Sequence, residues 1–373
     1  MISLSNYNDF LFYRDAMKQF LDQYISFVRK VLPQNESGIT SIGLDIEASS
    51  CRMVELTKRG TAFEIVQWAN QPIENGDTAK ALRSLLEKAK HPSRNPVSSI
   101  QGKGTLIRCV SMPRMPVEDL RKSLSLEADK YFPFAQDQVY TDCYILDPDS
   151  QDKKMNVLVA ASKKDIIDSR VKLLNSIGLQ ADYITLNPIA IANVMHALGG
   201  EVIVAHKNSE GDSGLALLHL GEGLSNLVIF SGRNPKFNRD IYIGSQDLIK
   251  RVSNALRISL PDAENILGNP KDKLPEILTA CESSLMNLIS EMRLSFDYFT
   301  TEYNVHIKTL VLTGSVTGVP AFVDYFAKNL DIKVETWNPF SGLKIADDVS
   351  KDELFKNANH LWGALGSALC QYD

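Results

Sequence analysis

Residue types that mark secreted and metal-binding proteins are scarce in this chain of 373 residues. The five cysteines are scattered, odd in number and without CxxC spacing: Cys51, Cys109, Cys143, Cys281 and Cys370. This usage favours a reducing compartment and no zinc site. His219 and Glu222 stand three residues apart, but no third ligand lies near them in the sequence. Chance spacing therefore explains this pair better than a metal site does.

Long apolar runs and basic blocks are also missing. The N-terminus has no basic segment followed by an apolar one, which argues against a signal peptide. No uninterrupted apolar run reaches the ~18 residues of a membrane-spanning helix. The net charge is −5 and no Lys/Arg block is present, which argues against a nucleic-acid partner. We therefore expect a cytoplasmic protein, long enough for two or three domains.

The stretch that organises the rest of the chain is residues 41–56. Apolar Ile42 and Leu44 alternate with small or acidic residues, a polar turn follows, and the apolar pattern returns from Met53. This pattern predicts a strand, a tight turn and a second strand. Asp45 at the end of the first strand, beside the N–H groups of the turn, suits a phosphate site. An ordinary surface hairpin with Asp at its turn has the same pattern.

The opening pattern occurs a second time in the chain. Residues 43–49 align without a gap over residues 217–223, and in both copies three strands lead into a helix. An internal repeat of this kind implies two like domains that face each other across a cleft. The sequence thus predicts an α/β fold with two duplicated domains.

The remaining segments set the predicted domain boundaries. A block with the order strand, helix, strand, strand, helix has the character of an inserted module. Small residues near the C-terminus suit close packing of a helix against its neighbour. We predict an inserted subdomain at 97–180, a first domain at 39–96 and 181–206 that is closed by 357–373, and a second domain at 207–356 with a helical block at 245–302.

Residues 1–38 stand apart from this scheme. Apolar residues recur there at three- and four-residue steps, which predicts one amphipathic helix over about 7–32, followed by a linker. The helix could dock on the body of the protein, could be offered to a partner, or could lie on a membrane surface. Its polar face mixes both charge signs, which disfavours the membrane alternative.

Together these segments resemble the actin/FtsA superfamily. Residues 41–52 match its first phosphate hairpin, 217–226 its second, 309–318 the strand and turn beside adenosine, and 357–369 a connecting helix. Two runs in the insert, RCVSMPRMP at 108–116 and LSLEADKYFPF at 124–134, resemble the type IV pilus assembly protein PilM family. The resemblance covers roughly 39–373. It implies an actin-like ATPase fold with an inserted SHS2-like subdomain.

The resemblance also implies a cleft for ATP and Mg²⁺, with no metal site made by the protein alone. Asp45 would be the catalytic carboxylate. The positions implied to bind the cofactor are Asp45, Ser49, Ser50, Arg52, Gly221, Gly223, Gly314 and Ser315.

Two departures from the family pattern argue against ATP turnover. Glu47 stands where the family has glycine, and a carboxylate at ~4 Å from a phosphate charge costs about 4 kcal/mol at an effective dielectric near 20, unless it turns away. His219 replaces the usual acid of the second hairpin, and imidazole is a poor substitute for the oxygen ligands of Mg²⁺.

The resemblance implies that the chain is a scaffold at the inner face of the inner membrane. Its partner would be the cytoplasmic tail of a PilN-like membrane protein, alongside other pilus platform proteins, so membrane association would be indirect. A groove on 97–180 would hold the tail, with Arg108, Tyr131 and Phe134 as candidate contacts. The alternatives are an active ATPase that uses Asp45 as its base, and an FtsA-like protein that forms filaments.

Overall fold

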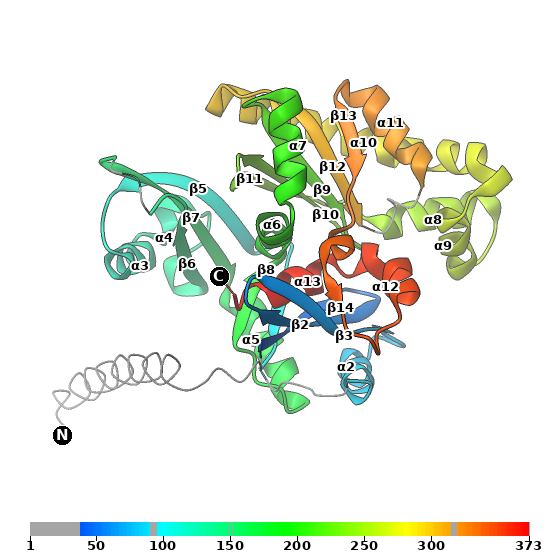
Figure 1. The fold of residues 1–373 in the computed structure, drawn as a ribbon, viewed down its shortest axis with the longest axis horizontal. Helices are drawn as coiled ribbons and strands as arrows, with labels where there is room; N and C mark the ends of the chain where they lie inside the picture. Colours follow the sequence, from blue (N-terminus) through cyan, green and yellow to red (C-terminus); the bar gives the residue numbers. More distant parts are fainter. Residues whose placement is uncertain (1–37, 90–94, 149, 151, 315–318, 373) are drawn as a thin grey trace.

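The structure is a computed structural model that describes residues 38–89, 95–148, 150, 152–314 and 319–372. The predicted N-terminal helix and Ser315 lie outside the described residues. Figure 1 shows one sheet in the lower half of the molecule, a second sheet in the upper half, and a smaller lobe on the left-hand side.

The lower sheet has six strands in the order β14-β3-β2-β1-β4-β8. Strands β1, β2 and β3 form an antiparallel meander, β14 runs parallel to β3, and β4 and β8 run parallel to β1. The strand bounds are β1 (Ile39–Ile46), β2 (Ser50–Arg59), β3 (Ala62–Pro72), β4 (Val97–Ile100), β8 (Tyr183–Leu186) and β14 (Lys344–Ile345).

The upper sheet has five strands in the order β11-β10-β9-β12-β13, again a meander followed by two parallel strands. Asp45 pairs with Arg52 across the first hairpin, and His219 pairs with Asn226 across the second, so the two hairpins have equal length. The predicted duplication is thus present in the order and direction of the strands. The bounds are β9 (Gly214–Leu220), β10 (Ser225–Ser231), β11 (Asn234–Ile241), β12 (Ile307–Gly314) and β13 (Lys333–Thr336).

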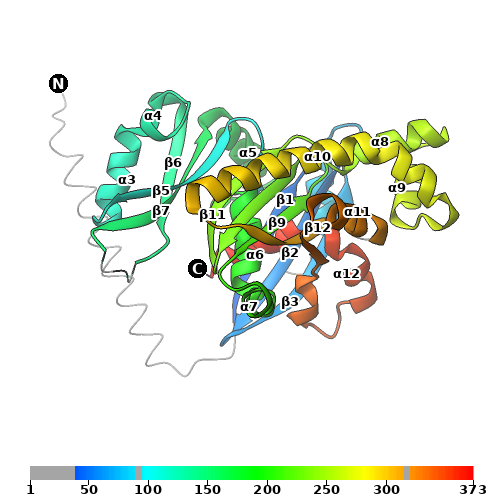
Figure 2. The ribbon, with the colours of Figure 1, turned by 90° about the horizontal axis from the view of Figure 1, so that it is seen from above.

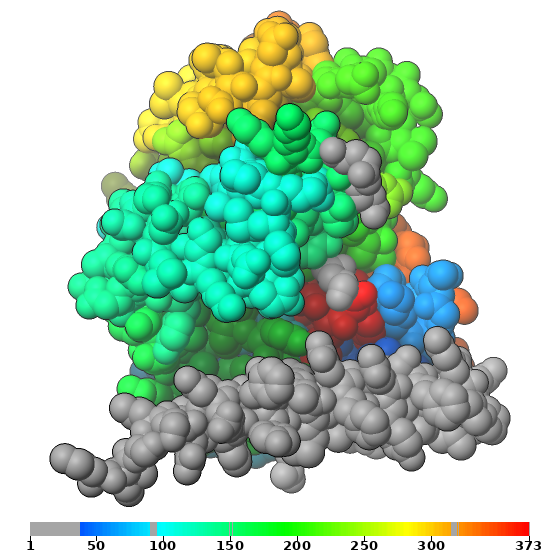
Figure 3. All heavy atoms as spheres, turned by 90° about the vertical axis from the view of Figure 1, so that its left-hand side faces the viewer, coloured from blue at the N-terminus to red at the C-terminus, as the bar shows by residue number. Residues whose placement is uncertain are grey.

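The smaller lobe comprises residues 105–163 and is called the inserted lobe below. Its antiparallel sheet has the order β5-β7-β6, with β6 at one edge. Figure 3 shows the lobe projecting as a distinct body from one side of the molecule. Its elements are β5 (Thr105–Pro113), α3 (Val117–Leu126), α4 (Ala128–Tyr131), η1 (Gln136–Gln138), β6 (Val139–Ile145) and β7 (Lys154–Lys163).

The other helices cover the two large sheets. Four of them complete the lower half: α2 (Thr78–Glu87), α5 (Lys164–Ser176), α6 (Asn187–Leu198) and α13 (Trp362–Leu369). The rest are α7 (Gly200–Glu210), α8 (Ser245–Leu256), α9 (Leu260–Gly268), η2 (Lys271–Lys273), α10 (Leu274–Tyr303), α11 (Pro320–Leu330), η3 (Pro339–Gly342), α12 (Lys351–Asn357) and η4 (Ala358–His360). Figure 2 shows the long α10 crossing the molecule from above.

Helices α6 and α13 lie between the two sheets and share one apolar core with both of them. The approach of α13 is close because its residues are small. A Cβ on Gly43 of β1 would stand 1.9 Å from the carbonyl oxygen of Ala364, and a Cβ on Gly366 would stand 2.0 Å from that of Ala190. The small residues predicted to allow close helix packing therefore do so.

Several local features differ from the sequence patterns. The order predicted for the insert has one helix after its first strand, whereas the structure has two there, α3 and α4, which Glu127 separates. Residues 97–100 form β4 of the lower sheet, although they fall inside the range predicted for the insert. In the described part of the chain no single helix is long and apolar enough to cross a membrane. Helices α6 and α7 together have the length and apolar composition of a membrane span, but they meet at an angle of 80°.

Candidate functional site

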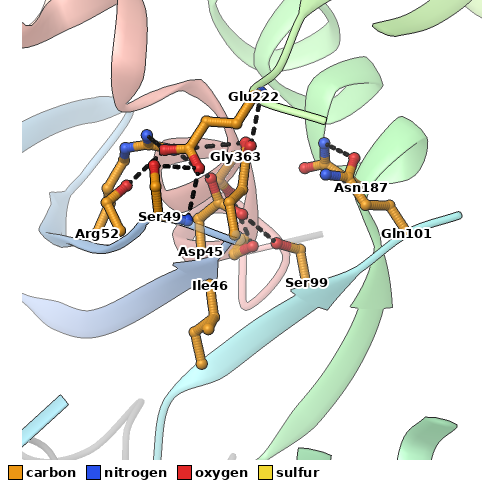
Figure 4. A network of polar contacts seen from close by, with 12 residues as sticks. Asp45, Ile46, Ser49, Arg52, Ser99, Gln101, Asn187, Glu222 and Gly363 are labelled. Atoms are coloured by element: carbon orange, nitrogen blue, oxygen red, sulfur yellow. Dashed lines mark hydrogen bonds and ion pairs between the residues drawn. The ribbon is translucent and has the colours of Figure 1, made fainter. Parts of the chain in front are cut away.

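Asp45 is the penultimate residue of β1, and it is buried. Arg52, its partner across the hairpin, donates from Nη1 to Asp45 Oδ2 at 3.5 Å. The hydroxyl of Ser99, just past the middle of β4, donates to the other carboxylate oxygen at 3.2 Å. Asp45 is therefore a buried, hydrogen-bonded carboxylate and not an exposed turn residue, as Figure 4 shows.

Glu222 belongs to the second turn, residues 221–224 between β9 and β10, yet its side chain reaches the first turn, residues 47–49 between β1 and β2. One carboxylate oxygen accepts from the backbone N–H of Ser49 at 2.9 Å and from its hydroxyl at 2.7 Å. The other oxygen accepts from the hydroxyl of Ser50 at 2.7 Å and from Nη2 of Arg52. Four donors of the first hairpin thus converge on one carboxylate of the second.

Glu47 makes the reciprocal connection. Its Oε2 accepts from the backbone N–H of Glu222 at 2.7 Å, and its Oε1 lies 3.4 Å from Nη1 of Arg52. Each turn thus supplies the carboxylate that satisfies a backbone N–H of the other turn. We call this set the inter-turn clamp; its members are Glu47, Ser49, Ser50, Arg52 and Glu222.

Burial and charge act differently on the three carboxylates that face Arg52. Burial raises the pKa of Glu47 to about 8, and neighbouring Asp45 adds to the effect. Burial also raises the pKa of Asp45, against the attraction of Arg52 and Arg170. Burial opposes ionisation of Glu222 as well, but Arg52 and the seryl donors together outweigh it and lower the pKa of Glu222. Glu222 is therefore the anion of the clamp at neutral pH.

His219 occupies the position equivalent to Asp45 in the second hairpin, and it is buried. Its Nδ1 lies 3.1 Å from the hydroxyl of Thr313, and its ring lies against that of Trp362, with centroids 6.1 Å apart. Burial, together with Arg52, lowers the pKa of His219 to about 3, so the ring is neutral at physiological pH. The second hairpin therefore has no side-chain charge where the first has Asp45.

A second polar bridge joins the two sheets beside the clamp. Asn187, at the start of α6, donates from Nδ2 to Asn226 on β10 and to Gln101 just after β4, both at 2.8 Å. Asn226 in turn donates to Asp240 on β11 at 2.8 Å. Neutral amide side chains therefore form this second connection, and Figure 4 shows Asn187 and Gln101 beside the clamp.

The predicted glycines differ in what surrounds them. Gly314 has φ +98° and lies against the backbone of Leu220, where a Cβ would stand 2.2 Å from the carbonyl oxygen. A Cβ on Gly221 would stand 2.8 Å from the carbonyl oxygen of Leu224, whereas nothing lies within 4 Å of such an atom on Gly223. Gly363 of α13, which the sequence did not single out, meets Asp45, whose Oδ2 would be 2.7 Å from its Cβ.

In this arrangement the residues do not fit a nucleoside triphosphate with its metal. The seryl and guanidinium donors suited to phosphate oxygens already hold the carboxylate of Glu222. When ionised, Asp45 and Glu47 would repel the negative charge of any phosphate placed next to them. Among the described residues no group of three or more His, Cys, Asp or Glu side chains could hold a metal ion. Nucleotide binding by the predicted positions stays a prediction.

The predicted partner contacts all lie in the inserted lobe. Arg108 is exposed on β5, whereas Tyr131 and Phe134 pack against the apolar core of the lobe. Near them a pocket of about 700 Å³ opens between the helices and β6; its lining residues are Ser125, Ala128, Gln136, Asp137, Val139, Tyr140, Thr141 and Lys164. The structure does not bring Arg108 to this pocket, and a role for the three residues in partner binding stays a prediction.

Arg170 on α5 connects the region after the inserted lobe to the cleft. Its Nη1 donates to the hydroxyl of Ser98 and to the carbonyl oxygen of Ser99, both at 2.7 Å, and its Nη2 lies 3.4 Å from the carbonyl oxygen of Ile46. Sequence reasoning missed this residue, as it missed Ser99. It also explained Glu222 by chance spacing. The gapless repeat was the signal for Glu222, because it places this residue in the turn opposite Ser49 and Ser50.

Comparison with known proteins places these features in context. Residues 43–372 match the family model described as type IV pilus assembly protein PilM. A solved structure of a PilM-PilN type IV pilus biogenesis complex matches with a TM-score of 0.75 and 21% identity, over 91% of this chain and 100% of that chain. An archaeal actin homolog, Ta0583, matches with a TM-score of 0.44 and 10% identity, over 90% of this chain and 97% of that chain. The match to the PilM-PilN structure, together with the duplicated strand order, shows the actin-like fold that the sequence predicted.

The cell division protein FtsA of Helicobacter pylori is a more distant curated relative. It is 25% identical over 108 residues, which is 29% of this chain. The chain spans only 20% of the length of this relative.

Proposed function

The chain belongs to the type IV pilus assembly protein PilM family, and from this we propose that it is an actin-like adaptor that binds the cytoplasmic tail of a PilN-like inner-membrane protein. In this proposal the protein works in the cytoplasm, at the inner face of the inner membrane, and reaches the lipid only through its partner. The family match over 43–372 carries the proposal. The similarity in fold to a PilM-PilN complex is consistent with it.

The inserted lobe offers the features that a short extended peptide needs. Strand β6 lies at the edge of the three-stranded sheet, and Tyr140 and Tyr144 on it are exposed. An edge strand can accept a peptide as an added strand, and a neighbouring pocket can select one of its side chains. We place the tail along β6 with one side chain in the adjoining pocket.

Excision of the lobe is the direct test of this placement. The cut must spare β4, which belongs to the lower sheet, and α5, whose Leu174 lies in the core of that sheet. A short linker can replace the lobe because the N–H of Lys163 donates to the carbonyl oxygen of Gly104 at 2.8 Å, so the two ends of the lobe are adjacent. A variant with 105–162 replaced by a glycine linker should fold and lose tail binding in calorimetry. Unchanged affinity would refute the placement.

A pair of point variants sharpens the test. Tyr144→Glu alters the β6 edge, and Tyr183→Glu alters a similarly exposed tyrosine on β8, the edge strand of the lower sheet. We expect at least a tenfold loss of tail affinity, about 1.4 kcal/mol, for the first variant and none for the second. Equal losses would point to a general charge effect instead of docking on β6.

We further propose that the protein acts without ATP turnover. The arrangement of Glu222, Glu47 and His219 supports this, because the phosphate donors are already engaged and a neutral ring occupies position 219, the equivalent of Asp45. Phosphate release by the wild type should equal that of Asp45→Ala. A rate clearly above this variant would favour the ATPase alternative.

A further inference from the structure

We propose that Glu222 is a tethered ligand which fills an oxyanion site of the first hairpin, so that the two halves of the cleft are joined without a bound phosphate compound. This inference concerns the cleft alone and does not depend on which partner the inserted lobe binds. It assigns to Ser49, Ser50 and Arg52 a ligand that comes from the same chain.

The geometry of the donors is that of a built anion site. One backbone N–H, two hydroxyls and one guanidinium converge on the two oxygens of a single carboxylate. Turns that present N–H groups beside hydroxyls and a cation bind phosphate and carboxylate alike, since both are compact oxyanions. The side chain of Arg52 is only 5% exposed, so its charge has no alternative partner in bulk water.

The tether is specific to the opposite half of the molecule. Glu222 lies 170 residues or more from each of its donors in the sequence, and it reaches them from the turn between β9 and β10. Glu47 returns the contact by accepting the N–H of Glu222. Two carboxylates therefore bridge the two turns, and each is covalently part of the turn that offers it.

Removal of the tethered carboxylate provides the main test. In Glu222→Ala the four donors lose their ligand, and free sodium acetate or inorganic phosphate should take its place. At concentrations about tenfold above the dissociation constant, either anion should raise the melting temperature of this variant by about 3 °C. Sodium chloride at equal ionic strength should not, and the wild type should not respond to acetate.

Glu291→Ala is the matched control. Glu291 also forms a close ion pair with an arginine, Arg239, but this pair is half-exposed and lies within the upper half of the molecule. Acetate should leave the melting temperature of this variant unchanged. A Glu222→Ala protein as stable as the wild type, or indifferent to both anions, would overturn the proposal.

Hydrogen exchange keeps the proposal testable if Glu222→Ala does not fold. Glu222→Gln preserves the shape of the side chain but removes its charge. Amide exchange should then quicken in the peptide that covers 46–52, at least tenfold, whereas Glu47→Ala, which removes the acceptor of the Glu222 N–H, should quicken exchange in the peptide that covers 220–226. Exchange that is unchanged at both turns would overturn the inference, because the N–H groups of Ser49 and Glu222 would then not depend on these carboxylates.

Calorimetry with inorganic phosphate separates a tethered ligand from a merely structural contact. Phosphate should bind Glu222→Ala at least ten times more tightly than the wild type, since only the variant has free donors. Equal affinities would mean that Glu222 does not occupy the anion site.

Discussion

The two hairpins at the cleft have the same backbone and different chemistry. Both have equal length, and both feed the same order of strands. Yet the first pairs Asp45 with Arg52, whereas the second pairs neutral His219 with Asn226. The first hairpin therefore offers donors and a cation, and the second offers a carboxylate from its turn. A duplicated fold can thus preserve geometry while its two copies specialise as site and ligand.

Removing the cation should break this comparison most strongly. Arg52→Met leaves Asp45, Glu47 and Glu222 facing one another in a buried site, which should cost about 3–5 kcal/mol of unfolding free energy. The equivalent change in the second hairpin is Asn226→Ala. It removes one hydrogen bond from Asn187 and one from Asp240, and should cost about 1–3 kcal/mol of unfolding free energy. Denaturant unfolding measures both values.

The control for this pair of variants is Arg59→Met. Arg59 lies on the same strand as Arg52, but its side chain is 61% exposed. It should change the unfolding free energy by less than about 1 kcal/mol. If Asn226→Ala were the more damaging of the two cleft variants, the asymmetry between the hairpins would be disproved.

Helix α13 contacts both hairpins: Gly363 lies against Asp45 of the first, and Trp362 lies against His219 of the second. A methyl group added at Gly363 would disturb the first contact. Gly363→Ala would drive a Cβ to within 2.7 Å of the Asp45 carboxylate, and should cost about 1–3 kcal/mol by overpacking. Gly342→Ala is the control, because nothing lies within 4 Å of its added Cβ. Thermal and denaturant unfolding of the two proteins should differ accordingly; equal stability would show that the first hairpin yields easily.

The last prediction concerns pH and tests the reciprocal contact. Glu47 faces Asp45 from β1, Arg52 from β2 and Glu222 from the second turn. Its pKa in the folded protein, about 8, lies above the usual 4.5, so the folded state binds more protons between these values. The contribution of Glu47 to stability should therefore fall as pH rises from about 5 to about 8, by at most about 1.4 kcal/mol per unit.

Comparison with Glu47→Gln isolates this contribution, since the variant has no proton to lose there. The difference in unfolding free energy between wild type and variant should decline across that pH window. A difference that is constant with pH would show that folding does not raise the pKa of Glu47.

The sequence predicted what local pattern controls. Alternating residues gave the hairpin at 41–56, and the gapless repeat gave the second copy, both of which the sheets confirm. Helix α7 contains the β-branched run Val202, Ile203 and Val204, which no helical pattern indicated, and here tertiary packing prevails over local preference. Strand β4 is short and half polar, so its burial became evident only from its pairing with β1.

The site was less predictable because its contacts connect distant segments. The sequence singled out Ser49, Ser50 and Arg52 as positions that bind a nucleotide, and that binding remains a prediction. The sequence showed that Glu47 is unusual at its position but did not show its hydrogen-bond partner. That partner, the backbone N–H of Glu222, lies 175 residues away. Charge complementarity between two turns of a repeat becomes visible only when the fold brings them together.

The packing of α13 on β1 has a consequence for how the protein is made. The hydroxyl of Ser41 donates to the carbonyl oxygen of Ala368, 327 residues later, and Gly43 receives the backbone of the same helix. A ribosome that adds 5–20 residues per second needs roughly 15–65 s to pass from one to the other. Throughout that interval Val54 and Leu56 of the neighbouring strand β2 also lack α13, which shares their core, so the nascent chain exposes an apolar surface that a chaperone can recognise. The packing of β1 against α13 can therefore be completed only at the end of synthesis.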